Sequence, residues 1–249
     1  MKKTSILIYI SILFCLSVNG QISDLRKLAI HGDVKSNHES SFTPVEMDGK
    51  IQNGAIEYSF FNRFNVSGNK IEDIKYTPEG KPDKKYEYIY DGFGRRIEQD
   101  QSGTDGKLTR KIIYKYDEIG NLTEDNSYNP EGKLEKKYTY KYDNQGNVIE
   151  DKSFDADNTL LKRFTYTFDA TGNKIENKRY SAHDILEKTI SYHYDISGNL
   201  TEEITVLPDQ TQSEFTYVYE FDNQHNWVRK IKFQDKKPVN ILVRELEYY

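Results

Sequence analysis

The chain has 249 residues, a formal net charge of −5 and one cysteine. It is a poor candidate for nucleic-acid binding, where neutralisation of phosphates supplies most of the affinity. Its low hydrophobic content of 36 % would suit a disordered chain, but its 20 tyrosines can bury large rings while keeping a polar end in water. We therefore expect a folded protein with a thin sheet rather than a thick aliphatic core, and no nucleic-acid partner.

Residues 1–20 have the organisation of a secretory signal peptide. Lys2 and Lys3 form a basic start, Ile6 to Val18 is apolar, and Gly20 ends a small-residue cleavage site. The apolar run is shorter than the roughly 20 residues of a spanning helix. A retained anchor and a lipoprotein are the alternatives. Cleavage removes the only cysteine, so we expect a secreted, periplasmic or cell-surface protein without disulfides or a transmembrane segment.

Residues 21–55 do not follow the pattern of the rest of the chain. Ser23 to Ile30 predicts a short helix with Ser23 as its N-cap, or an irregular lead-in. Asp33 to Glu46 can hold a strand, and Met47 to Lys50 is typical of a turn. Because repeat arrays need atypical terminal units, we expect this segment to be an N-terminal cap.

Residues 56–249 contain a repeat marked by an aromatic residue followed by Asp or Asn. The aromatic residue lies at Phe64, Tyr90, Tyr116, Tyr142, Phe168, Tyr194 and Phe221, so five spacings are 26 residues and the last is 27. A fixed period of this size is typical of a repeat architecture. We therefore predict seven repeats of 26 residues.

Each repeat holds two turns. The first is Asp-x-x-Gly-Asn, as in Asp117 to Asn121, and the second is exemplified by Thr77-Pro78-Glu79-Gly80. Alternating β-formers lie between the turns. The fold class is therefore all-β, an antiparallel β-hairpin meander. Because about fifteen twisted strands exceed the usual limit of an open sheet, we expect a curled or spiral sheet, or a partly closed barrel.

The turn geometry also predicts which side chains share a face. It places Tyr140 opposite Glu150 and Asp125 opposite Lys137 on neighbouring strands. Tyrosines recur at three positions of one face, which we take as the more buried one, while salt bridges and isoleucines occupy the other.

The motif Tyr-x-Tyr-Asp-x-x-Gly-Asn-Leu/Val-x-Glu resembles the bacterial YD-repeat, or RHS-repeat, family. Its clearest copies begin at Tyr114 and Tyr192. The resemblance covers residues 56–249 and implies curled sheets of the kind that form shells in secreted toxins or surface proteins, with carbohydrate binding often ascribed to them. The array is too short to enclose a toxin domain, so a short exported member without one is expected.

Candidate catalytic and metal sites are few. The histidines have no metal-ligand spacing, and no phosphate loop or nucleophile motif occurs. One glutamate position recurs, at Glu72, Glu98, Glu124, Glu150, Glu176 and Glu202. This row either binds Ca²⁺ or accepts hydrogen bonds from tyrosines, and we favour the second interpretation. We therefore expect no catalytic residue, no metal, no cofactor and no enzyme activity.

The candidate binding residues are aromatic: Tyr114, Tyr140, Tyr166, Tyr192 and Trp227. Trp227 could instead cover the end of the array as a cap. The leading hypothesis is an exported, non-enzymatic protein of the cell envelope that binds a glycan or an envelope protein through its sheet face and turns. The alternative is a structural scaffold that assembles through its sheet edges.

Overall fold

The computed structural model describes residues 22–249, and the predicted signal peptide lies outside that range. The described chain contains one short helix, α1 (Asp24–Lys27), and sixteen antiparallel strands. The strands are β1 (Val34–Met47), β2 (Lys50–Phe64), β3 (Lys70–Tyr76), β4 (Pro82–Tyr90), β5 (Arg96–Gly103), β6 (Leu108–Tyr116), β7 (Leu122–Tyr128), β8 (Leu134–Tyr142), β9 (Val148–Asp155), β10 (Leu160–Phe168), β11 (Lys174–Ser181), β12 (Leu186–Tyr194), β13 (Leu200–Val206), β14 (Gln212–Phe221), β15 (Trp227–Gln234) and β16 (Lys237–Tyr248).

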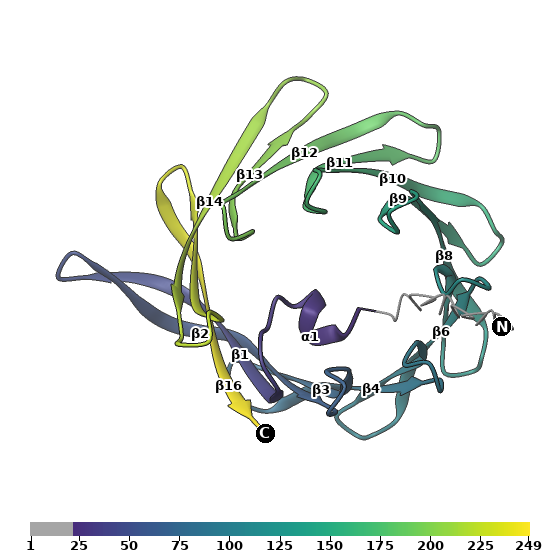
Figure 1. Cartoon of the computed structure of the whole chain (residues 1–249), viewed down its shortest axis with the longest axis horizontal. Coiled ribbons are helices and arrows are strands. Elements are labelled where there is room, and N and C mark those ends of the chain that lie inside the picture. The colour runs from purple at the N-terminus through teal and green to yellow at the C-terminus, as the bar shows by residue number, and fades with distance from the viewer. Residues whose placement is uncertain (1–21) are drawn as a thin grey trace, which may run out of the picture.

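The strands form one closed barrel, in which each strand pairs with its neighbours in the chain and β1 pairs with β16 (Figure 1). The predicted antiparallel meander is confirmed, but the predicted spiral sheet of seven repeats is wrong. Residues 34–55, which were expected to belong to a cap, supply β1 and the first part of β2. The closing register runs from Val34 opposite Tyr248 to Phe42 opposite Ile241.

The predicted turn chemistry is confirmed. The Asp117 carboxylate accepts hydrogen bonds from the amides of Ile119 and Asn121, at 3.1 and 2.8 Å, and Gly120 has a φ of 92°. His225 takes the same left-handed conformation, with a φ of 62°, where the other turns have glycine. Each such turn therefore joins two strands into a hairpin.

The predicted register is wrong beyond the first residue pair of each Asp turn, because the hairpin closed by that turn contains a β-bulge. Tyr142 lies opposite Val148 as expected, but Ile149 is an extra residue, so Glu150 lies opposite Lys141 and Tyr140 opposite Asp151. One extra residue moves the partners to opposite faces. A second bulge does the same beside the other turn.

The second bulge overturns the expected pairing of Asp125 with Lys137. Asp125 lies opposite Tyr138, and Lys137 lies opposite Asn126. The repeated aspartates therefore share the face of the tyrosines, while the glutamate row lies on the other face.

The tyrosine face lines the inside of the barrel. Helix α1 lies within the ring of strands in Figure 1, and its Asp24 carboxylate accepts hydrogen bonds from Tyr90 and Arg96, both at 2.8 Å. The glutamate row faces outward and pairs with lysines, as in Lys115 with Glu124 at 2.6 Å and Lys141 with Glu150 at 3.0 Å. The interpretation that these glutamates accept from tyrosines is therefore wrong.

The barrel has no aliphatic centre among its described residues. The buried apolar cluster, formed by Leu25, Ile30, Val34 and Phe64, lies where α1 meets the wall. At about 4.8 Å per strand and a tilt of about 40°, opposite walls of a 16-stranded barrel are about 30 Å apart. The space that the inner faces enclose, here called the lumen, is therefore too wide for wall side chains alone to fill.

Candidate functional site

A row of six tyrosines lines the lumen, one on each second strand from β4 to β14: Tyr88, Tyr114, Tyr140, Tyr166, Tyr192 and Tyr217. Four of the five predicted binding residues belong to it. All six rings are half-buried. Because the lumen is not filled, these rings keep part of their surface open to it.

The hydroxyl groups of this row are held by the preceding strands. Tyr88 donates to Asp73 at 2.6 Å, and Tyr114 donates to Gln99 at 3.0 Å. Tyr140 donates to Asp125 and Tyr166 to Asp151 in the same way. The acceptors were missed in the sequence, although they immediately follow the glutamate row, because the bulge that turns them inward has no sequence signal.

Burial controls the ionisation of these groups. It raises the pKa of the Asp125 and Asp151 carboxyls, and the hydrogen bonds from Tyr140 and Tyr166 offset this only in part. Burial, together with the neighbouring carboxylates, also raises the pKa of both tyrosines. The hydroxyls therefore stay protonated at neutral pH and remain donors, which fixes the rings against the wall.

A second row, formed by the tyrosines of the aromatic-Asp pairs, ties successive hairpins together. Tyr90, Tyr142 and Tyr194 donate to the backbone carbonyls of Lys70, Leu122 and Lys174, at 2.7, 2.9 and 2.8 Å. Tyr116 makes the equivalent bond to Arg96, and in the last repeat Tyr219, two residues before the pair of Phe221 and Asp222, makes it to Leu200. Burial raises the pKa of Tyr219 to about 12. The aromatic-Asp pair thus has a structural role.

A cation stands between two rings of the first row. Lys174 Nζ lies 5.3 Å from the centroid of Tyr166 and 5.0 Å from that of Tyr192. Burial lowers the pKa of Lys174, and Glu203 and Asp151 counteract this. Lys174, Asp151 and Tyr166 line a cavity of about 330 Å³ together with Val148 and Phe168. Aromatic faces, a cation and a carboxylate therefore meet at one place in the lumen.

Trp227 is buried, unlike the four predicted tyrosines, which are half-buried. It is only 8 % exposed, and the Arg244 guanidinium carbon lies 3.5 Å from its ring centroid. Arg244 also donates to the Leu28 carbonyl at 3.3 Å, so Trp227 lies near the segment that carries α1. Its ring is covered, as the alternative interpretation of a cap expects.

Helix α1 and the loop after it are fastened to the barrel end that carries the Asp turns. Leu25 donates its amide to the Gly68 carbonyl at 3.0 Å. The His31 amide donates to the fully buried Asn226, at 2.6 Å, in the last Asp turn. Arg96 and other donors keep the pKa of Asp24 below its usual value, although burial opposes this. This segment therefore lies inside one end of the lumen, bound to the wall (Figure 1).

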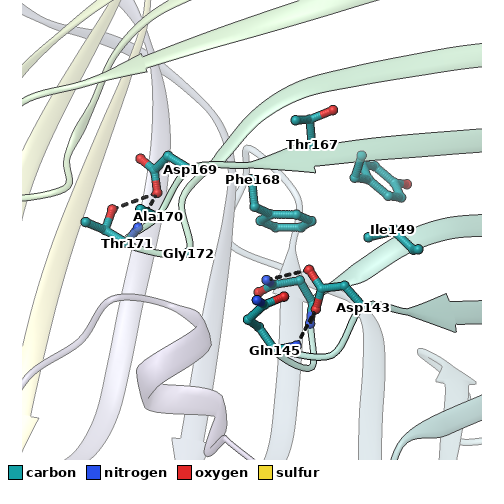
Figure 2. A pocket seen from close by; sticks show the side chains of 11 residues that line it. Asp143, Gln145, Ile149, Thr167, Phe168, Asp169, Ala170, Thr171 and Gly172 are labelled. Carbon is teal, nitrogen blue, oxygen red and sulfur yellow. Dashed lines mark hydrogen bonds between the residues drawn. The ribbon is translucent and has the colours of Figure 1, made fainter.

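The rim formed by the Asp turns carries a repeated notch (Figure 2). A cavity of about 610 Å³ lies between the turn of Asp143 and the turn of Asp169, beside Phe168 and Ile149. Each of its lining residues has a counterpart 26 positions later in a second cavity of about 470 Å³. The notches are thus a consequence of the repeat, and their tips are small polar residues such as Thr171.

Two kinds of feature are not found among residues 22–249. No group of three or more His, Cys, Asp or Glu side chains is placed to hold a metal ion. No helix in this range is long and apolar enough to cross a membrane.

Comparison with solved structures supports this fold in one case. A porin-like protein from Bacteroides uniformis matches with a TM-score of 0.59 and 10 % identity, over 86 % of this chain and 98 % of that one. A porin-like protein from Bacteroides vulgatus matches with a TM-score of 0.42 and 14 % identity, over 88 % and 99 % of the two chains. The TcdB2-TccC3-Cdc42 complex gives 0.36 and 13 %, over 84 % of this chain and 12 % of that one. Only the first score supports a shared fold, and at this identity the likeness concerns the fold alone.

Sequence comparison corrects the resemblance to YD- or RHS-repeat proteins. No curated protein matches the chain. The family model that matches residues 23–170 is not that of the YD- or RHS-repeat proteins, and the solved structure with the TM-score of 0.59 is a porin-like protein. The Tyr-Asp and Gly-Asn motif does not identify that family, because the hairpins of this barrel require the same residues: Asp caps the turn and Tyr donates to the preceding hairpin. The match covers more than half of the chain, which therefore belongs to the family described as "Uncharacterised protein".

Proposed function

We propose that this protein is an exported, non-enzymatic binding protein of the bacterial cell envelope whose lumen holds a carbohydrate. The observation that carries the proposal is the row of half-exposed tyrosine rings on the inner wall, with Lys174 and Asp151 between them. The negative face of an aromatic ring attracts the C–H groups of a sugar ring. A few polar groups among aromatic walls, as here, orient a bound ligand.

The composition of the outer face supports a location in water rather than in a lipid bilayer. It carries ion pairs in which several members are well exposed, such as Lys115 with Glu124 and Lys141 with Glu150. A lysine or arginine on the lipid face of a membrane barrel costs about 2–4 kcal/mol near the midplane. A row of them is therefore incompatible with lipid, and the predicted signal peptide supports a place in the periplasm or at the cell surface.

The rival proposal, a scaffold that assembles through sheet edges, has weaker support. Strand β1 pairs with β16 over residues 34–42. A closed barrel has no edge strand to offer to another chain. A protein partner would have to use the rim of Asp turns instead, where the notches lie.

Binding of the exported protein to a glycan array tests the proposal. We expect binding by the wild type and at least a tenfold loss of affinity in Tyr166→Ala and Tyr192→Ala, because both remove ring surface from the lumen. Tyr166→Phe keeps the ring and should bind well. Tyr180→Ala is the matched control, since Tyr180 lies on the outer face under Arg163, whose Cζ is 4.0 Å from its centroid.

Two results would contradict the proposal. One is the absence of binding to every glycan by a folded wild-type protein. The other is an equal loss of affinity in Tyr180→Ala and in the two lumen variants, which would place the glycan on the outside.

A further inference from the structure

A row of basic side chains lines the lumen at the end opposite α1. It consists of Lys84, Arg110, Lys136, Lys162 and Lys188, and is called the basic row. Each member precedes a tyrosine of the first row by four residues on the same strand, without an intervening bulge, so its side chain shares the inner face. Its members lie next to the second turns, at the end of the barrel away from α1.

The neighbouring strands add to this charge. Lys75 lies opposite Lys84, and Arg179 lies opposite Lys188, whereas the other three members face Gln101, Ser127 and Ser153. On the other flanking strand Asp155 lies opposite Lys136, but its carboxylate accepts from the amides of Asp157 and Thr159, at 3.0 and 2.8 Å, and forms no ion pair with Lys136. The other cross-strand partners of the row are uncharged or basic, so Asp155 is the one acidic partner among them.

Few carboxylates compensate for these seven cations. Asp83 pairs with Lys75 at 3.0 Å and Glu135 with Arg110 at 3.6 Å. Glu187 pairs with both Lys162 and Arg179. Lys84, Lys136 and Lys188 form no ion pair or side-chain hydrogen bond within residues 22–249. Three of the seven cations thus remain available to an anion.

The basic row is positively charged, although the chain as a whole has a formal net charge of −5. The outward-facing residues that follow the row are also basic, but three of them pair with the glutamate row: Lys85 with Glu72, Lys111 with Glu98 and Arg163 with Glu150. A cleft lined by one sign of charge focuses the electric field and raises the local concentration of an oppositely charged ligand. Unpaired cations at the lumen mouth therefore favour the approach of an anion, while the charges of the outer wall are largely paired with one another.

Along the lumen, the chemistry changes in a fixed order. The basic row lies at the mouth, an apolar row that includes Tyr138 and Phe164 follows two residues later, and the two tyrosine rows come next. Helix α1 lies at the far end, where Arg96 of the wall donates to Asp24. A ligand that enters by the mouth meets charge first and ring faces second.

We propose that the lumen takes an anionic oligosaccharide, whose carboxylate or sulfate groups bind the basic row while its sugar rings stack on the tyrosines. This inference rests on the proposed carbohydrate binding and specifies its ligand class. Lys84, Lys136 and Lys188 supply the free cations, and Tyr140, Tyr166 and Tyr192 supply the rings.

Calorimetric titration with hexagalacturonate and with its fully methyl-esterified form separates charge from sugar recognition, because the two share every ring. We expect the exported protein to bind the acid at least tenfold more tightly than the ester, and to lose this preference as NaCl rises from 50 to 500 mM. The double variant Lys136→Gln/Lys188→Gln should bind the acid about tenfold more weakly, with the ester unaffected.

The matched control is Lys115→Gln/Lys141→Gln, which removes the same charge from the outer wall and should stay within twofold of wild type. Equal affinity for acid and ester would overturn the inference, while leaving the carbohydrate proposal intact if Tyr166→Ala weakens both. Binding of polyglutamate as tight as that of the acid would also overturn it, because the site would then capture any polyanion. Binding of neither sugar by a protein that binds another, neutral glycan would overturn only the ligand class.

Discussion

Replacing Asp24 by alanine should release α1 from the barrel. The Asp24 carboxylate accepts from the Lys70 amide at 3.0 Å and from Tyr90 and Arg96 at 2.8 Å. The side chains of Asp24 and Arg96 are only 8 % and 19 % exposed. Removing one partner of a buried ion pair costs about 3–5 kcal/mol. Because Arg96 also lies over the Tyr88 ring, at 4.2 Å, we expect the lower end, about 3 kcal/mol.

Hydrogen exchange of the Leu25 amide is the most direct assay, since this amide donates to the Gly68 carbonyl only when α1 is docked. A loss of about 3 kcal/mol corresponds to roughly a hundredfold faster exchange, at about 1.4 kcal/mol per tenfold change. Asp33→Ala is the matched control, because Asp33 has the same charge in the same segment and contributes only its backbone carbonyl to the contact with Tyr249.

The same contact predicts a pH dependence. The pKa of Asp24 is lowered in the folded protein, so its contribution is fully present above the unfolded value of about 3.9 and is lost as the pH falls through the folded value. Wild type and Asp24→Ala should therefore differ at pH 7 and converge in strong acid. Exchange at Leu25 in Asp24→Ala as slow as in wild type at pH 7 would show that Asp24 does not hold α1 against the wall.

Three further changes test the wall of the barrel. Asp125→Asn keeps an acceptor for Tyr140 but removes a buried charge, so it should leave the free energy of unfolding at pH 7 unchanged or raise it by about 1 kcal/mol. Because burial raises the pKa of Asp125, the stability it contributes is present below about pH 3.9 and lost as the pH rises through its folded value, so this advantage should vanish in acid. His225→Gly relieves a left-handed conformation and should raise the free energy of unfolding by about 1 kcal/mol in urea titrations. Gly54→Ala would place a Cβ 2.8 Å from the Thr43 carbonyl oxygen. It should lower the free energy of unfolding by about 1–3 kcal/mol, which a lower melting temperature would reveal.

The hairpins could be predicted from the sequence because their signals are local. Asp117 caps its own turn, Gly120 supplies the left-handed residue, and the 26-residue spacing repeats the arrangement. The shared face of the tyrosines follows from alternation along one strand. These features need no knowledge of distant residues.

Closure and register could not be predicted, for two physical reasons. Pairing of Val34 with Tyr248 joins the two ends of the described chain, and β1 carries none of the repeat motif that marks the other strands. The bulge at Ile149 inserts one residue without any change of spacing in the repeat. That single residue decides whether Asp151 or Glu150 faces the tyrosines, and therefore which carboxylates belong to the site.

The basic row illustrates the same division. Lys136 and Lys188 follow the 26-residue period in the sequence as clearly as the tyrosines do. Their meaning depends on knowing that the sheet closes, since a row of lysines on an open sheet is an ordinary solvated face. Closure turns that row into the lining of a mouth.

A crystal structure of the exported protein with a glycan that binds it tests the central claim most directly. We expect density for sugar rings inside the barrel, in contact with the faces of Tyr140, Tyr166 and Tyr192. Density confined to the outer wall or to the rim of Asp turns, with the inner tyrosines untouched, would contradict it.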